Sequence, residues 1–147
     1  MKIFDTHAHY DDEAFDEDRE QLLAGLFNGN ISTIVNVGAA FEGCKASIEL
    51  ASRYDNIYAA IGVHPDDYER LEKNPEFLSW LKQEALTNKK VVAIGEIGLD
   101  YYYDELGREL QKKWFAKQLE LAVSIRKPVI IHSRDACADT IDILRDG

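Results

Sequence analysis

Short apolar segments alternate with amphipathic ones along the chain, and this alternation predicts the fold class. The apolar segments are rich in valine and isoleucine and are nearly continuous rather than alternating, and they cover residues 2–7, 33–38, 57–64, 91–99 and 128–132. Strands with this pattern are typical of parallel sheets that are covered on both faces. We therefore expect five parallel strands.

The segments between the expected strands carry apolar residues at helical spacing. The clearest are residues 22–27, 41–51, 110–125 and 141–144. Gly29 follows the first of them at the position of a C-terminal cap. Asn74 and Pro75 are expected to be the N-cap and first residue of a further helix, because these residue types are favoured there.

Five strand-then-helix units with no linker, low-complexity stretch or clear internal repeat predict one α/β domain over residues 1–147. Two architectures remain open at this point, an open doubly wound sheet and part of a barrel. A complete eightfold barrel takes typically ~250 residues, so this chain would supply only about five of its eight units.

Composition narrows the range of partners and compartments. The net charge is −10, with 17 basic against 27 acidic residues, which argues against a protein that holds nucleic acid mainly by neutralising phosphates. Cys44 and Cys137 lack metal or redox spacing, so we expect two small buried side chains in a reducing compartment. With neither a leader nor a membrane-spanning segment in the pattern, we expect a cytoplasmic protein without membrane contact.

Polar residues are concentrated where the expected strands end. They are His7 and His9 after the first strand, His64 after the third, Glu96 and Asp100 after the fourth, and His132 and Arg134 after the fifth. All four histidines of the protein belong to this group. Active sites of parallel α/β proteins form at the C-terminal ends of the strands, so we expect these side chains to meet.

Strand alternation gives a second indication. Residues two apart point to the same face, which groups Asp5 with His7 and His9, Ile94 with Glu96, Gly98 and Asp100, and Ile130 with His132 and Arg134. Glu96 is the most informative, because a lone carboxylate between Ile94 and Ile97 would be desolvated unless it were paired or bound to metal. Gly95 and Gly98 would allow neighbouring groups to approach closely.

Three imidazoles and a carboxylate at one rim suit Zn, Mn or a similar divalent ion. In this interpretation His7 and His9 hold one ion, Glu96 ligates or bridges, and His132 completes the first ion or serves a second. Metal ions that activate water and polarise an ester or phosphoryl oxygen make hydrolysis the expected reaction. His64 and Arg134 are left to meet substrate, and the guanidinium favours an anionic one.

Each residue also has a simpler interpretation when it is taken alone. His7 and His9 would form a hydrogen-bonded pair, Glu96 would be neutralised by an internal cation, and Arg134 would make a surface ion pair with Asp135 or Asp139, worth little. The tyrosines at residues 101–103 would either pack at the rim or offer a platform on which bases stack. The joint placement of the residues favours the metal site.

Four motifs carry a resemblance to a known family. "DTHAHYD", "GVHP", "GEIGLDYYY" and "PVIIHSRDA", in this order and at these separations, closely resemble the TatD-type metal-dependent deoxyribonucleases, a branch of the amidohydrolase-like TIM-barrel hydrolases. The resemblance runs over essentially the whole chain. It implies divalent-metal-dependent hydrolysis of phosphodiester bonds in DNA, typically by 3′ to 5′ exonuclease action. The matching metal-ligand positions are His7, His9, Glu96 and His132, and those near the scissile phosphate are His64 and Arg134.

The chain also departs from the family pattern. The family barrel continues for roughly another hundred residues, with a further histidine ligand and an aspartate that acts as ligand and base. By the resemblance this is an N-terminal portion of a barrel, as a shortened gene product, an engineered piece or a cleaved fragment. Such a piece leaves two sheet edges and an apolar flank uncovered, which predicts self-association.

Three hypotheses follow. The first is a phosphodiesterase acting on weakly held DNA, with one or two Mg, Mn or Zn ions, Glu96 and His64 in catalysis, and His64, Arg134 and Tyr101 at the substrate. The second is a catalytically incomplete fragment or metal-binding module that keeps the ligands. The third, which the anion preference of Arg134 argues against, is a related enzyme acting on a small amide or lactone.

Overall fold

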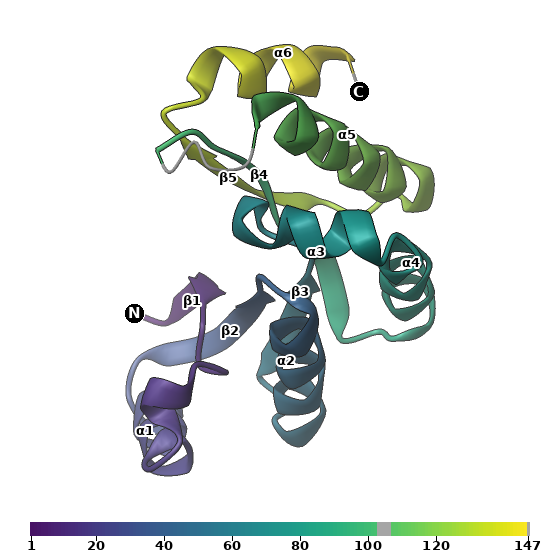
Figure 1. Cartoon of the computed structure of the whole chain (residues 1–147). Helices are drawn as coiled ribbons and strands as arrows, with labels where there is room; N and C mark the ends of the chain where they lie inside the picture. The colour runs from purple at the N-terminus through teal and green to yellow at the C-terminus, as the bar shows by residue number, and fades with distance from the viewer. Residues whose placement is uncertain (103–106, 147) are drawn as a thin grey trace.

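The five expected strands form one parallel sheet that curls into a half-barrel. The computed structural model describes residues 1–102 and 107–146. The strands follow each other in chain order, as β1 (Ile3–Ala8), β2 (Ile31–Gly38), β3 (Ile57–Ile61), β4 (Val91–Asp100) and β5 (Val129–Arg134). A doubly wound sheet reverses its strand order at a switch point, and this sheet does not. The barrel alternative is therefore the correct one (Figure 1).

Helices follow the strands and cover one side of the sheet in Figure 1. They are α1 (Arg19–Asn28), α2 (Phe41–Arg53), α3 (Tyr68–Lys73), α4 (Phe77–Thr87), α5 (Arg108–Ile125) and α6 (Cys137–Asp146), with single 3-10 turns η1 (Glu13–Phe15) and η2 (Pro65–Asp67). The helices predicted from periodicity are all present, and Gly29 caps α1 by donating to the carbonyls of Gly25 and Leu26. The short α3 and the two 3-10 turns were not predicted, because they are too brief to show a period.

The predicted start of α4 is wrong by two residues. The helix begins at Phe77, and Asn74 instead ends α3. The reason is local: the side-chain amide of Asn74 donates to the carbonyl of Arg70 in the preceding helix, so Asn74 does not cap the following one. Pro75 lies between the two helices.

Apolar side chains form a layer on each face of the sheet. The larger layer joins strand residues to the helices, and among its members are Ile34, Ile61, Ile94, Leu99, Leu23, Cys44, Leu81 and Phe115. The smaller layer is made of strand residues alone, with Val35, Val37, Ala60 and Ala93 at its centre and Tyr58, Val92 and Ile130 packed against them. The smaller layer therefore marks the inner face of the half-barrel, as expected for a sheet that closes on itself.

Two irregularities change which residues share a face. Asp5 pairs with Ile34, a residue of the helix-facing core, and the register shifts between Asp5 and Ala8. A second shift lies between Ile94 and Ile97 in β4. The expected grouping of Asp5 with His7 is therefore wrong, as is that of Ile94 with Glu96, because an extra residue in a strand interrupts the period of two.

The two thiols differ in exposure. Cys44 is buried, as expected, and Cys137 is exposed. The expectation of a buried Cys137 is wrong because this residue begins α6 at the outside of the molecule. Apolar side chains are also exposed on the edge strand β1, where Ile3 and Phe4 are 43% and 57% accessible. Self-association through the sheet edges stays a prediction. None of the helices in the described part of the chain has the length and apolar character that crossing a membrane requires.

Candidate metal centre

The C-terminal ends of the strands bring all four histidines and Glu96 together. Their donor atoms form two groups of three, each with all donors within 4.8 Å of one another: His7, His9 and Glu96 in the first, and His64, Glu96 and His132 in the second. Glu96 belongs to both groups. The side chain of Glu96 is only 13% exposed, so its charge requires a partner at this place.

The first group has the spacing of ligands around one ion. His7 Nε2 lies 3.1 Å from His9 Nε2, and Glu96 Oε2 lies 3.4 Å from the former and 4.0 Å from the latter. Two ligand atoms bound to a tetrahedral zinc ion at its usual bond lengths lie about 3.3 Å apart. The nitrogen pair therefore fits a shared ion with little movement.

The backbone of β2 fixes the orientation of His9. His9 Nδ1 lies 2.8 Å from the carbonyl oxygen of Val37, and since a carbonyl can only accept, Nδ1 carries the proton. The lone pair of the ring is then on Nε2, which faces His7 and Glu96. A hydrogen bond of this kind at the second ring nitrogen is what metal-binding histidines use to fix their tautomer.

The second group contains two histidines in different roles. His132 Nδ1 lies 3.2 Å from Glu96 Oε1, and the rings of His132 and His64 meet edge to face with 4.2 Å between centroids. His64 lies three residues beyond β3, where its Nδ1 accepts the backbone N–H of Asp66. Burial first, and then the neighbouring His132, lower the pKa of His64. A neutral imidazole that accepts at Nδ1 carries its proton on Nε2, so His64 is a hydrogen-bond donor there.

Asp100 supports the second group by contacting the ring of His132. Its Oδ2 lies 2.9 Å from His132 Nε2, and its Oδ1 accepts the backbone N–H of Tyr102. Burial opposes ionisation of Asp100, but these two partners outweigh it and the pKa of the carboxyl is lowered. The sequence placed Asp100 at this rim without giving it a role. The available signal was its position at the end of β4, four residues after Glu96.

Glycine allows β4 to approach β5 beside the cluster. Gly98 has a φ of 147°, and a Cβ added there would lie 1.9 Å from the carbonyl oxygen of His132. A Cβ on Gly95 would lie 2.6 Å from the Cβ of Ile130. Larger residues would therefore push β5, and His132 with it, away from Glu96.

Two of the three predicted substrate residues, Arg134 and Tyr101, lie in different surroundings. The guanidinium of Arg134 lies over the ring of Tyr102, 3.7 Å from its centroid, and Tyr102 is 56% exposed. Tyr101 is 8% exposed, and its hydroxyl donates to Asp139 of α6. The structure thus brings Arg134 to the exposed tyrosine and engages Tyr101 in packing against α6. Tyr103 lies outside the described residues.

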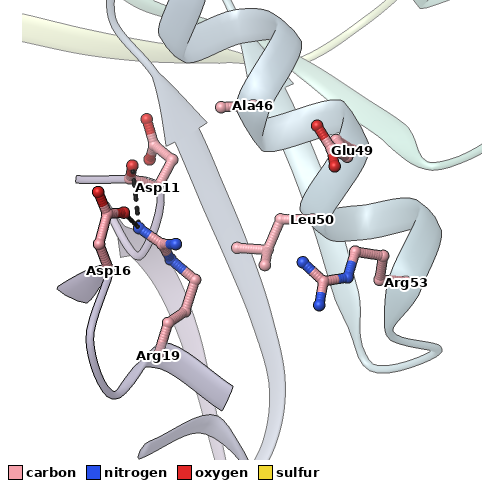
Figure 2. Close-up of a pocket in the computed structure, with 7 residues that line it drawn as sticks. All are labelled: Asp11, Asp16, Arg19, Ala46, Glu49, Leu50 and Arg53. Carbon is pink, nitrogen blue, oxygen red and sulfur yellow. Dashed lines mark hydrogen bonds and ion pairs between the residues drawn. The ribbon is translucent and has the colours of Figure 1, made fainter. Parts of the chain in front are cut away.

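The loop after β1 is held in place by an arginine of α1. The guanidinium of Arg19 donates to the carbonyls of Tyr10 and Asp12 and to the side chain of Asp16. Figure 2 shows this guanidinium turned toward the loop, at one end of a hollow that α2 closes on the other side. The loop that follows His9 is therefore anchored to α1.

Comparisons with known proteins agree with this geometry. A family model described as "TatD related DNase" matches residues 4–147. The chain is 41% identical over 144 residues to a Bacillus subtilis protein named as the uncharacterized metal-dependent hydrolase YabD, covering 98% of this chain and 55% of that protein. It superposes on the crystal structure of YjjV, a TatD homologue from Escherichia coli, with a TM-score of 0.86, 34% identity, and coverage of 98% of this chain and 55% of the other.

A TatD-family hydrolase from Entamoeba histolytica superposes with a TM-score of 0.89 at 26% identity, covering 99% of this chain and 54% of that chain. The chain therefore spans about half the length of the relatives it matches. The match extends over nearly all of the residues that form the half-barrel and its two groups of candidate metal ligands. The chain belongs to the family of TatD-related DNases.

Proposed function

We propose that the protein is a divalent-metal-dependent hydrolase of phosphodiester bonds in DNA. The observation that carries the proposal is the shared carboxylate: Glu96 lies within ligand distance of two separate histidine groups. A carboxylate between two donor groups suits a pair of ions, and paired ions are the usual means of phosphodiester cleavage. The family description and the names of the relatives support the same reaction class.

The donor atoms around Glu96 indicate which residues would bind each ion. His7 and His9 would hold one ion, His132 a second, and Glu96 would lie between them. Divalent ions bound here supply an activated water and neutralise charge on a phosphoryl oxygen. His9 is held by Val37 and His132 by Asp100, so both rings present a fixed nitrogen toward Glu96. Imidazole and carboxylate together suit Zn or Mn, and the carboxylate also suits Mg.

The remaining side chains act on the substrate. His64 donates a hydrogen bond from Nε2–H to a phosphate oxygen, because its Nδ1 already accepts the backbone N–H of Asp66. Glu96, which contacts both histidine groups, would set the positions of the ions and so of the water that they activate. Arg134 binds the phosphate through its guanidinium, which gives an anionic substrate a docking point on an acidic protein. Exonuclease action in the 3′ to 5′ direction and a cytoplasmic location belong to this proposal.

A second candidate function rests on length. Because the chain spans about 55% of relatives such as YabD, it could hold ions through these ligands without completing the catalytic site. In that case it is a metal-binding half-barrel.

One assay separates the two. Single-stranded DNA labelled at either end is incubated with the protein and with Mg, Mn or Zn, beside His7→Ala and beside Gln83→Ala, a substitution on the exposed surface of α4. The proposal expects cleavage by the wild type and Gln83→Ala and none by His7→Ala, with products that shorten from the 3′ end. Ion binding without cleavage by any variant would leave the half-barrel as a metal-binding module.

A further inference from the structure

Pairing between β3 and β4 stops before either strand reaches the metal centre. The register runs from Ala59 opposite Val91 to Ile61 opposite Ile94, and no pair follows although β4 continues to Asp100. On their other sides the two segments are still paired. The backbone N–H of His64 donates to the carbonyl of Ala39 beyond β2, and the backbone N–H of Tyr101 donates to the carbonyl of Arg134 in β5.

The residues between these bonds therefore turn their backbone groups into a gap between β3 and β4. Three buried side chains from helices fill this gap, and each makes two hydrogen bonds to one residue. Gln118 accepts from the N–H of Val63 at 2.8 Å and donates to its carbonyl at 3.0 Å. Gln111 does the same with Asp100, at 2.8 and 2.7 Å.

Tyr68 makes the same pair of hydrogen bonds to the backbone of Gly98. Its hydroxyl donates to the carbonyl of Gly98 at 2.9 Å and accepts from the N–H at 3.1 Å. Burial raises the pKa of Tyr68, so the hydroxyl keeps the proton that it donates. Tyr68 and Gln118 are fully buried and Gln111 is 2% exposed. We call these three side chains the polar wedge.

The targets of the polar wedge adjoin the site residues. Val63 directly precedes His64, and Gly98 pairs with His132 across the sheet. Asp100 is itself the partner of the His132 ring. Paired strands lie about 4.8 Å apart, so side chains that take over the ladder bonds must hold the strands further apart than that.

We propose that the polar wedge is a positioning device, which sets the separation of β3 and β4 and thereby the distance from His64 to Glu96 and His132. This inference rests on the proposed metal centre, which it deepens. The two glutamines are seven residues apart, about 10.5 Å along α5. One rigid helix therefore holds both the segment after β3 and the end of β4. An apolar side chain at Gln118 would leave the backbone groups of Val63 buried without partners. The segment after β3 that carries His64 would then shift.

The test compares Gln118→Met with Phe115→Leu, a core substitution on the same helix that breaks no bond to Val63. Affinity for a short single-stranded oligonucleotide in the presence of Mn is measured by calorimetry in both, in the wild type, and in each combined with His64→Ala, with folding checked by circular dichroism and ion binding titrated separately. We expect Gln118→Met to weaken oligonucleotide binding about tenfold, because a displaced His64 loses its hydrogen bond to the phosphate, and Phe115→Leu to leave it unchanged. In the His64→Ala background, Gln118→Met should cause no further loss, because it acts through that residue.

Equal affinity of Gln118→Met and wild type, or a full loss that persists without His64, would overturn the inference. If Gln118→Met does not fold, Gln118→Asn replaces it, since its shorter amide cannot reach both backbone groups. A wild type that binds no ion, or no oligonucleotide in the presence of ion, would refute the proposed function. Hydrogen exchange at the Val63 amide then tests the polar wedge alone: faster exchange in Gln118→Met than in Phe115→Leu supports it, and equal exchange overturns it.

Discussion

The carboxylate of Asp100 and the imidazole of His132 meet across two neighbouring strands, with Oδ2 2.9 Å from Nε2. The other oxygen of Asp100 accepts the backbone N–H of Tyr102, so the carboxylate cannot rotate without losing a bond. His132 is left with Nδ1 facing Glu96. Carboxylate, histidine and ion in this order are a recurrent arrangement, in which the carboxylate orients the ring and raises its basicity.

Asp100→Asn should therefore weaken ion binding while leaving the fold intact. The amide keeps the size of the side chain but removes the charge that holds the His132 proton on Nε2. We expect a loss of affinity of about 10- to 100-fold in a calorimetric titration. Affinity equal to that of the wild type would show that Asp100 only packs at this place.

Glu96→Gln should have a different effect from either single-histidine variant, because Glu96 is the member common to both groups. If the protein binds two ions, His7→Ala should remove one and His132→Ala the other, whereas Glu96→Gln should weaken both. Stoichiometry measured by calorimetry, with elemental analysis of the dialysed protein, distinguishes these cases. Unchanged stoichiometry in all three variants would contradict the metal centre.

Arg134→Ala should reduce substrate binding without changing ion content. A charge-assisted hydrogen bond to phosphate is worth about 1.5–3 kcal/mol, so KM for an oligonucleotide should rise roughly 10- to 100-fold. Arg145→Ala is the matched control, since Arg145 carries the same charge on an exposed position of α6. A parallel loss of bound ion in Arg134→Ala would show that its contribution is to the shape of the site.

The two thiols should react in sequence with an alkylating reagent. Burial raises the pKa of Cys44 to about 12, and its thiol donates to the carbonyl of Gly62, so at pH 8 it is both protonated and covered. Cys137 is exposed. Mass spectrometry should find one adduct on the native protein and two in urea, and Cys137→Ser should show none until it unfolds. Two adducts on the native protein would mean that the core around Cys44 opens readily.

Much of the fold and of the site composition could be predicted from the sequence. Nearly continuous runs of valine and isoleucine mark buried parallel strands, and helical spacing marks what covers them, because both patterns repeat within one element. His7, His9, Glu96 and His132 follow from the same reasoning, since the C-terminal ends of parallel strands meet at one rim. The extent of the domain stays a prediction, and the experiments above test the roles of the site residues.

The tertiary structure decided what depends on contacts between elements. Register shifts in β1 and β4 turn Asp5 and Ile94 away from the side chains they were expected to join, and no local pattern records where a strand gains a residue. Tyr101 is occupied by Asp139, which lies on another helix. The roles of Gln111 and Gln118 were equally hidden, because a glutamine in a helix is ordinary until the strands behind it part and leave their backbone groups for it to bind.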